Sequence, residues 1–144
     1  MYRYIRRGFS LLEILIALLI LGIILVFVSP QVADYIKETR FVAHIELARA
    51  YQTQVEECLR DTGQLGRCDA GINGIQSVPA NLPDTIHSVT VTDGVITVNA
   101  ESDTFMNGET LILTPTLPNT GGVAWALTGN CASAGLCATE NFSQ

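Results

Sequence analysis

The chain has 144 residues, enough for one modest domain and hardly for two. It carries 8 Lys and Arg against 14 Asp and Glu, a formal net charge of −6, and no basic residue follows Arg67. An acidic chain of this kind is a poor candidate for nonspecific binding to nucleic acid.

The first predicted element is an apolar helix long enough to cross a membrane. Residues 9–28 are interrupted only by Ser10 and Glu13, and at about 1.5 Å per residue they span roughly 30 Å, one hydrocarbon core. Three arginines precede this segment, so the positive-inside rule predicts a cytoplasmic N-terminus and an exported remainder. The run is longer than the apolar part of a signal peptide, and no small-x-small cleavage site follows it cleanly, so we expect it to stay in the mature protein.

Glu13 is the only charged residue inside this segment. A charge at mid-bilayer costs at least ~2.5–3.5 kcal/mol, and residues that carry one usually have a functional reason. One interpretation is a capping box, in which Ser10 and Glu13 satisfy backbone donors at the start of the helix. That interpretation leaves the glycine and the pair of arginines immediately upstream unexplained.

The stretch RRGFSLLEILIALLILGIILVFVSP resembles the N-terminal signature of type IV prepilins. In that family a short basic leader ends in glycine, a phenylalanine follows, and a glutamate lies four residues beyond it in a hydrophobic stretch. The matching residues are Arg6, Arg7, Gly8, Phe9 and Glu13. The direct resemblance covers roughly residues 6–35, and beyond them it is architectural and weaker.

The resemblance implies processing followed by assembly. An aspartyl prepilin peptidase would cut between Gly8 and Phe9 on the cytoplasmic face, and the new Phe9 amine would be N-methylated. An unpaired buried charge costs several kcal/mol, so pairing this cationic amine with Glu13 of a neighbouring subunit would offset the cost for both groups. Glu13 would then fix the axial register between helices that are otherwise uniformly apolar.

The same resemblance divides the chain into three parts. These are a cleaved leader at 1–8, a membrane-spanning and filament-core helix at 9–30, and an exported head at 31–144 that includes the rest of the helix. It also implies that the span from Gly22 to Pro30 can unwind in the fibre, since glycine has weak helix propensity and proline removes a backbone hydrogen bond. The alternative is that Gly22 only lets helices approach closely and Pro30 only bends one.

Beyond Pro30 the helical pattern continues to about Leu59, and the helix becomes amphipathic. The apolar positions that share one face are Phe41, Ile45, Ala48, Val55 and Leu59. Glu56 and Arg60 are spaced for an i,i+4 ion pair, and Gly63 is the predicted C-cap.

A β-hairpin is the next predicted element. β-Branched runs within residues 85–100 lie on both sides of Asp93-Gly94, a dipeptide typical of a two-residue hairpin turn. The preceding residues, 71–84, have the Gly, Pro and Asn content of an ordered loop.

Two further strands are predicted towards the C-terminus. They occupy residues 109–117, where Pro115 and Pro118 are expected to stop the strand, and residues 121–129. Four antiparallel strands covering the helix give an α+β fold class. This is also the pilin fold that the resemblance implies.

All four cysteines lie beyond the apolar segment, where an exported chain would be oxidised, so two disulfides are predicted. Three pairings are possible, and the short sequence separations favour Cys58–Cys68 and Cys131–Cys137. The family often closes a surface loop near the C-terminus with a disulfide. Here that loop is unusually short, so we interpret the bridge as a staple of the chain end.

An enzyme is not expected. The two histidines, His44 and His87, have no partners fixed by a motif, and HIELA is not the HExxH of a zinc protease. The cysteines form no CxxC motif and are accompanied by no paired histidine, so no metal and no cofactor are predicted.

The predicted function is that of a structural subunit of a type IV pilus, with adhesion, twitching motility or DNA uptake as filament roles. The alternatives are a minor pilin or tip adhesin, and a type II secretion pseudopilin. The implied partners are further copies of the chain, the prepilin peptidase, the assembly platform with its ATPases, and a host surface or DNA. The implied locations are the bacterial inner membrane for the precursor and the extracellular pilus, or fimbrium, for the assembled product.

Overall fold

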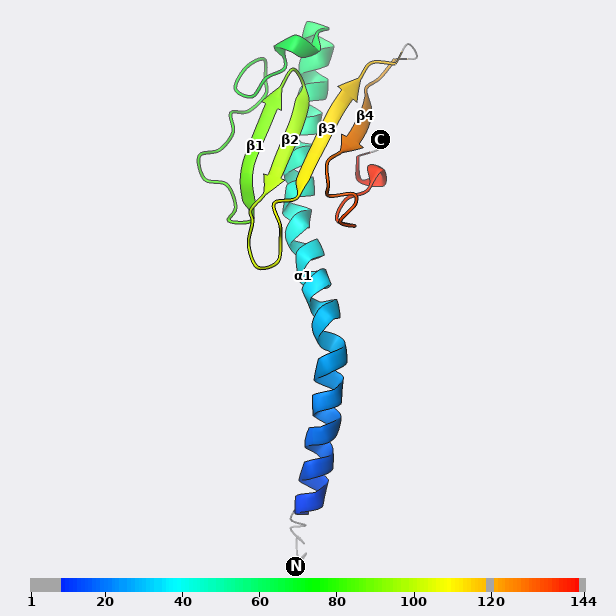
Figure 1. Ribbon diagram of the computed structural model, residues 1–144. Coiled ribbons are helices and arrows are strands. Elements are labelled where there is room, and N and C mark those ends of the chain that lie inside the picture. Colours follow the sequence, from blue (N-terminus) through cyan, green and yellow to red (C-terminus); the bar gives the residue numbers. More distant parts are fainter. Residues whose placement is uncertain (1–8, 119–120, 143–144) are drawn as a thin grey trace, which may run out of the picture. The chain divides into compact units, whose positions relative to one another are not determined.

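A computed structural model describes residues 9–118 and 121–142, leaving aside the side chains of residues 28–31. The chain divides into two compact units between Tyr35 and Ile36. The elements are α1 (Leu11–Thr62), η1 (Leu65–Arg67), β1 (Ile86–Thr92), β2 (Val95–Ala100), β3 (Thr110–Thr116), β4 (Ala124–Thr128) and η2 (Thr139–Asn141) (Figure 1).

Helix α1 begins at Leu11, slightly later than the predicted start at Phe9. The Ser10 carbonyl accepts the first backbone hydrogen bonds, from the N–H of Glu13 at 3.0 Å and of Ile14 at 3.2 Å. Ser10 is therefore the residue before the helix, and Phe9 precedes it. Among the described residues, neither the Ser10 hydroxyl nor the Glu13 carboxylate makes a hydrogen bond, so the capping box is not formed here.

The helix ends at Thr62, just beyond the predicted limit at Leu59. Gly63 has φ of +68° and donates its N–H to the Leu59 carbonyl at 2.8 Å. This left-handed residue closes the last helical turn, and the predicted glycine C-cap is confirmed.

The four strands form one antiparallel sheet in the order β1-β2-β3-β4. The predicted hairpin is confirmed, with Thr92 opposite Val95 and the turn residues Asp93 and Gly94 at φ of 51° and 75°. Positive φ at both central residues is what a type I′ turn requires, and this turn matches the twist of the flanking strands.

The prediction that Pro115 stops the third strand is wrong. β3 continues to Thr116, and Pro115 lies opposite Trp125 in the ladder with β4. On its other side β3 pairs with β2 only as far as Leu113. Beyond that point a missing amide N–H costs no ladder hydrogen bond to β2, so proline is tolerated there.

The core of the head lies between one face of α1 and one face of the sheet (Figure 1). Of the five predicted helix positions, Phe41, Ala48, Val55 and Leu59 are buried and Ile45 is half-buried. The buried face is wider than predicted, because His44, Tyr51, Gln52 and Cys58 also belong to it. The opposing sheet residues are Val89, Val91, Ile96, Val98, Leu111 and Leu113. The fold is therefore α+β, with a long N-terminal helix and a four-stranded antiparallel sheet.

Replacing Gly94 by alanine is expected to destabilise the head by about 2–3 kcal/mol, because a Cβ at a positive φ would also be overpacked. That Cβ would lie 2.8 Å from Leu65 Cδ2 and 3.3 Å from both Pro115 Cγ and Val55 Cγ1. Gly74 has a similar φ of +85° but open space around its Cβ position, so Gly74→Ala should cost only about 1 kcal/mol. Urea unfolding followed by fluorescence of the single tryptophan measures both variants. Equal losses of unfolding free energy in the two variants would show that the close contacts around Gly94 add nothing to the cost of its positive φ.

Candidate functional site

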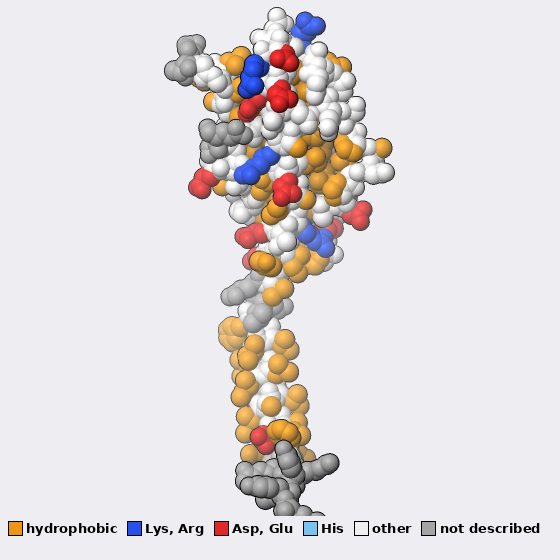
Figure 2. All heavy atoms as spheres, turned by 180° about the vertical axis from the view of Figure 1, so that it is seen from behind, with side chains coloured by type: hydrophobic (Ala, Val, Ile, Leu, Met, Phe, Trp, Pro, Cys, Tyr) orange, Lys and Arg blue, Asp and Glu red, His pale blue; other side chains and the backbone are white. Residues whose placement is uncertain are grey.

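The first half of α1 presents an apolar surface on all sides. The large apolar side chains of residues 9–27 are between 51% (Ile14) and 78% (Phe9) exposed. Figure 2 shows this segment as a nearly continuous hydrophobic surface interrupted by an acidic group. A contiguous apolar surface of this extent marks a protein or membrane interaction site.

The same segment forms part of a candidate membrane span. Among the described residues, no single helix is both long and apolar enough to cross a membrane. The two segments Leu11–Phe27 and Val32–Thr62 pass the same test of length and composition when taken together.

Phe9 and Glu13 lie together at the start of this surface. They line a shallow hollow of about 430 Å³ with Ile14, Ala17 and Leu18. Glu13 is the acidic residue of the first helical turn, where a carboxylate interacts favourably with the helix dipole. The arrangement offers an anionic group inside an apolar surface, one turn from the residue whose amine the predicted cleavage would expose.

Several predicted site residues stay untested by the structure. Arg6, Arg7 and Gly8 lie outside the described residues, as does the side chain of Pro30. Gly22 is within α1, and a Cβ there would meet nothing within 4 Å. The predicted unwinding between Gly22 and Pro30 therefore stays a prediction.

The structure joins Cys58 to Cys68 and Cys131 to Cys137, the pairing that the sequence separations favour. The first bridge links the last turns of α1 to the segment that leads to the sheet, and its Cα atoms are 5.9 Å apart. The second closes a compact turn, in which Leu136 donates its N–H to the Cys131 carbonyl at 2.9 Å.

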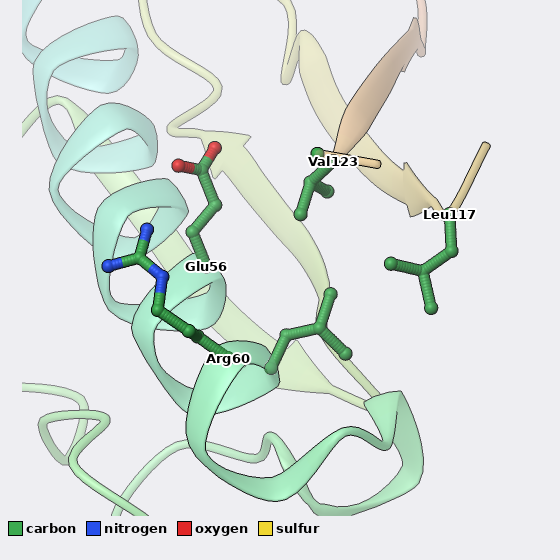
Figure 3. Close-up of a pocket in the computed structure, with 6 residues that line it drawn as sticks. Glu56, Arg60, Leu117 and Val123 are labelled. Atoms are coloured by element: carbon green, nitrogen blue, oxygen red, sulfur yellow. The ribbon is translucent and has the colours of Figure 1, made fainter. Parts of the chain in front are cut away.

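A groove lies between α1 and the turn that joins β3 to β4. It consists of two adjoining hollows of about 290 and 510 Å³ that share Glu56, Gly122 and Val123. Figure 3 shows Glu56 and Arg60 projecting from α1 on one side, with Val123 and Leu117 on the other.

The predicted ion pair between Glu56 and Arg60 is wrong for the part of the chain that the structure describes. Glu56 Oε1 instead accepts a hydrogen bond from Trp125 Nε1 at 2.7 Å. A partly buried indole N–H needs an acceptor, and this carboxylate supplies one. No local sequence pattern could have found the contact, because the two residues are 69 positions apart.

The two histidines lie in different environments, one in the core and one on the surface. His44 is fully buried and stacks on Phe41, whereas His87 Nδ1 lies 3.0 Å from Glu101 Oε2 on the surface. Within the described residues, no group of three or more His, Cys, Asp or Glu side chains is placed to hold a metal ion.

Two family models match the chain. Residues 3–29 match a prokaryotic N-terminal methylation motif, and residues 39–140 match the pilin (bacterial filament) family. The second match covers most of the head, including the sheet and both disulfides.

Curated and solved proteins agree with these matches. The chain is 30% identical over 130 residues to prepilin peptidase-dependent protein D of Escherichia coli K12, covering 88% of this chain and 83% of that protein. It is 27% identical over 134 residues to fimbrial protein EcpC of Eikenella corrodens, covering 90% and 87%. The solution structure of the major type IV pilin PpdD from enterohemorrhagic E. coli superimposes with a TM-score of 0.55 at 30% identity, covering 67% of this chain and 70% of that one.

Proposed function

The chain belongs to the type IV pilin family, and from that premise we propose that it is the major structural subunit of its filament. Its biochemical act is then assembly, with no catalysis and no cofactor. The alternatives within the family, a minor pilin or tip adhesin and a type II secretion pseudopilin, share the N-terminal signature. A compact head with few basic residues and no long insertion favours the major subunit.

The observation that carries the proposal is the exposed apolar helix with a single carboxylate. The large apolar side chains from Phe9 to Phe27 are more than half exposed, and Glu13 is the only charged residue in this segment. Such a surface is stable in lipid before assembly and against other helices after it. None of the ion pairs found among the described residues includes Glu13, and a second subunit is the proposed source of its partner.

Processing would create that partner. Cleavage between Gly8 and Phe9 by a prepilin peptidase removes the leader and leaves an amine at Phe9, which is then methylated. The methylated amine stays cationic, so it can still pair with Glu13 of a neighbour. The precursor is proposed to sit in the inner membrane, and the assembly platform and its ATPases to move it into the filament.

Intact mass measured on sheared surface material tests this proposal. We expect a chain that begins at Phe9, carries one added methyl group, and gains four hydrogens on reduction of its two disulfides. A full-length chain, or one cut after the apolar segment, would contradict the processing step. A correctly processed chain found only in membranes would contradict filament assembly.

Abundance separates a major subunit from a minor one. Quantitative gel analysis of the sheared filaments should show this chain as their dominant protein. A trace amount beside a more abundant pilin would assign it to the minor class. Adhesion, twitching motility and DNA uptake would then each be compared between cells with and without the filament.

A further inference from the structure

The loop that joins β2 to β3, residues 101–109, is braced from within. Asp103 Oδ1 accepts the backbone N–H of Phe105 at 2.7 Å and of Met106 at 2.8 Å. The Asp103 N–H in turn donates to the Met106 carbonyl at 2.9 Å. Because the Met106 side chain is fully buried in the core, the loop is anchored as well as internally bonded.

Two ion pairs join this braced loop to α1. Lys37 Nζ lies 2.6 Å from Glu109 Oε1, and Arg40 Nη1 lies 2.6 Å from Asp103 Oδ2. The Arg40 guanidinium also stacks over the Phe105 ring, 4.5 Å from its centroid. The Glu109 residue is only 3% exposed, so its charge depends on Lys37 for compensation.

A third contact lies one turn further along α1. His44 is fully buried, and its Nε2 is 2.9 Å from the Thr85 carbonyl oxygen. The same oxygen accepts the backbone N–H of Glu101 at 2.9 Å, at the start of the loop. Thr85 therefore ties the helix and the loop together immediately before β1.

The helix changes character where these contacts begin. Val32 is 45% exposed and Tyr35 is 70% exposed, whereas Phe41 and His44 are fully buried. The boundary between the two compact units falls at Ile36, directly before Lys37. Helical stability in proteins comes mostly from the packing of a buried face, so the part of α1 before this boundary has less packing to stabilise it within the subunit.

We propose that residues 101–109 with Thr85 form a clasp that fixes residues 37–44 of α1 to the head. Unwinding or fraying of α1 that starts in its exposed N-terminal half stops at the clasp. The clasp is a property of the single subunit, so it is measured on unassembled chains and stands or falls separately from the proposed filament role.

Hydrogen exchange on the full chain in detergent micelles tests the clasp. Glu109→Gln removes the charge that Lys37 pairs with, and we expect about tenfold or greater loss of protection in peptides covering residues 36–48. Glu101→Gln is the matched control: it makes the same charge change, but the described ion pair of the Glu101 side chain is with His87 of β1 and not with α1. Unchanged protection in Glu109→Gln, or an equal loss in Glu101→Gln, would overturn the proposal.

A second region and a second variant guard against general unfolding. Peptides from β2 and β3 should keep their protection in Glu109→Gln if only the clasp opens. If they lose it equally, Asp103→Asn becomes the deciding variant, since its side chain is part of an exposed ion pair. Asp103→Asn should then lower protection at residues 36–48 alone, and a uniform change across the head would overturn the clasp.

Acid is expected to open the clasp, because three of its groups have lowered pKa values. Burial lowers the pKa of His44 below 6.5, against weaker opposing effects of the Thr85 and Arg40 carbonyls and the Glu109 charge. Hydrogen bonds from the Phe105 and Met106 amides lower the pKa of Asp103 below 3.8. Burial alone would raise the pKa of Glu109, but hydrogen bonds and attraction from Lys37 together with backbone amides lower it below 4.5.

The sign is the same for all three groups. Each binds protons more readily in the unfolded segment, so its contribution to stability is complete above its unfolded pKa and is lost as the pH falls towards its folded pKa. The groups that act on His44 are the Glu109 charge and the Thr85 carbonyl from the head, with the Arg40 backbone carbonyl on its own helix. Protection of residues 36–48, corrected for the intrinsic exchange rate, should begin to fall below about pH 6.5 and fall further below about pH 4.5. Protection of residues 36–48 that stays constant from pH 6.5 to below pH 4.5 would overturn the proposal.

Discussion

Replacing Glu13 by valine is expected to reduce surface filaments by at least about 100-fold, while the chain still accumulates in the membrane. The reason is that the cationic Phe9 amine of the neighbouring subunit would be buried without its anionic partner. Removing one partner of a buried ion pair typically costs about 3–5 kcal/mol, which corresponds to two or more powers of ten in an association constant. Membrane insertion should not suffer, because the variant segment is more apolar than the original.

Filament yield by shearing and quantitative immunoblot measures this effect, with total chain in the membrane fraction as the reference. Glu13→Gln separates charge from shape, since it keeps the side-chain volume and removes only the negative charge. Glu57→Gln is the control, because it makes the same charge change at an exposed position of α1 in the head. Normal filaments from both Glu13 variants would remove Glu13 from assembly. Normal filaments from the glutamine variant alone would replace ion pairing with hydrogen bonding as the mechanism.

The features predicted correctly from the sequence rest on local patterns. The helical spacing of Phe41, Ala48 and Val55 marks a buried face whatever lies opposite, and Asp93-Gly94 between β-branched runs specifies its own turn. The head architecture follows from these patterns. The apolar stripe of a long helix needs an apolar partner, and the strands predicted downstream can supply one.

The features missed depend on contacts between distant residues. Glu56 has a suitable partner one turn away in Arg60, yet it binds Trp125 from β4. Pro115 reads locally as a strand breaker, and only the shorter ladder with β2 makes it harmless. The ion pairs of Lys37 and Arg40 with the loop from 101 to 109 have the same character. No periodicity in the sequence predicts that residues 37–40, in the middle of α1, contact that loop.

Removing the Cys58–Cys68 disulfide is expected to destabilise the head more than removing Cys131–Cys137. Bridges with sequence separations of 10 and 6 restrict the unfolded chain by similar amounts, about 2.8 and about 2.4 kcal/mol in the chain-entropy model. The difference between the two bridges therefore lies in what each one holds in the folded state.

Cys58–Cys68 holds the hairpin turn against the end of α1. The Cys68 carbonyl accepts the Gly94 N–H at 2.9 Å, and the Ala70 N–H donates to the Val91 carbonyl at 3.1 Å. Both sulfur-bearing residues are at most 1% exposed and belong to the core. Without the bridge, the segment that carries these bonds is held by fewer constraints, and the space left by sulfur adds a packing cost.

The double variant Cys58→Ala/Cys68→Ala should therefore lose about 3–4 kcal/mol, a fall in Tm of roughly 10–20 °C for a domain of this size. Cys131→Ala/Cys137→Ala should lose less, about 2.5 kcal/mol, because the hydrogen bonds between Asn130 and Thr110 still hold the neighbouring segment. Trp125 fluorescence follows both unfolding transitions, since its indole joins α1 to β4 through Glu56. Equal losses would indicate that both bridges act only by restricting the unfolded chain. A larger loss on removal of Cys131–Cys137 would contradict the prediction and show that the C-terminal turn contributes more to stability than the hairpin turn does.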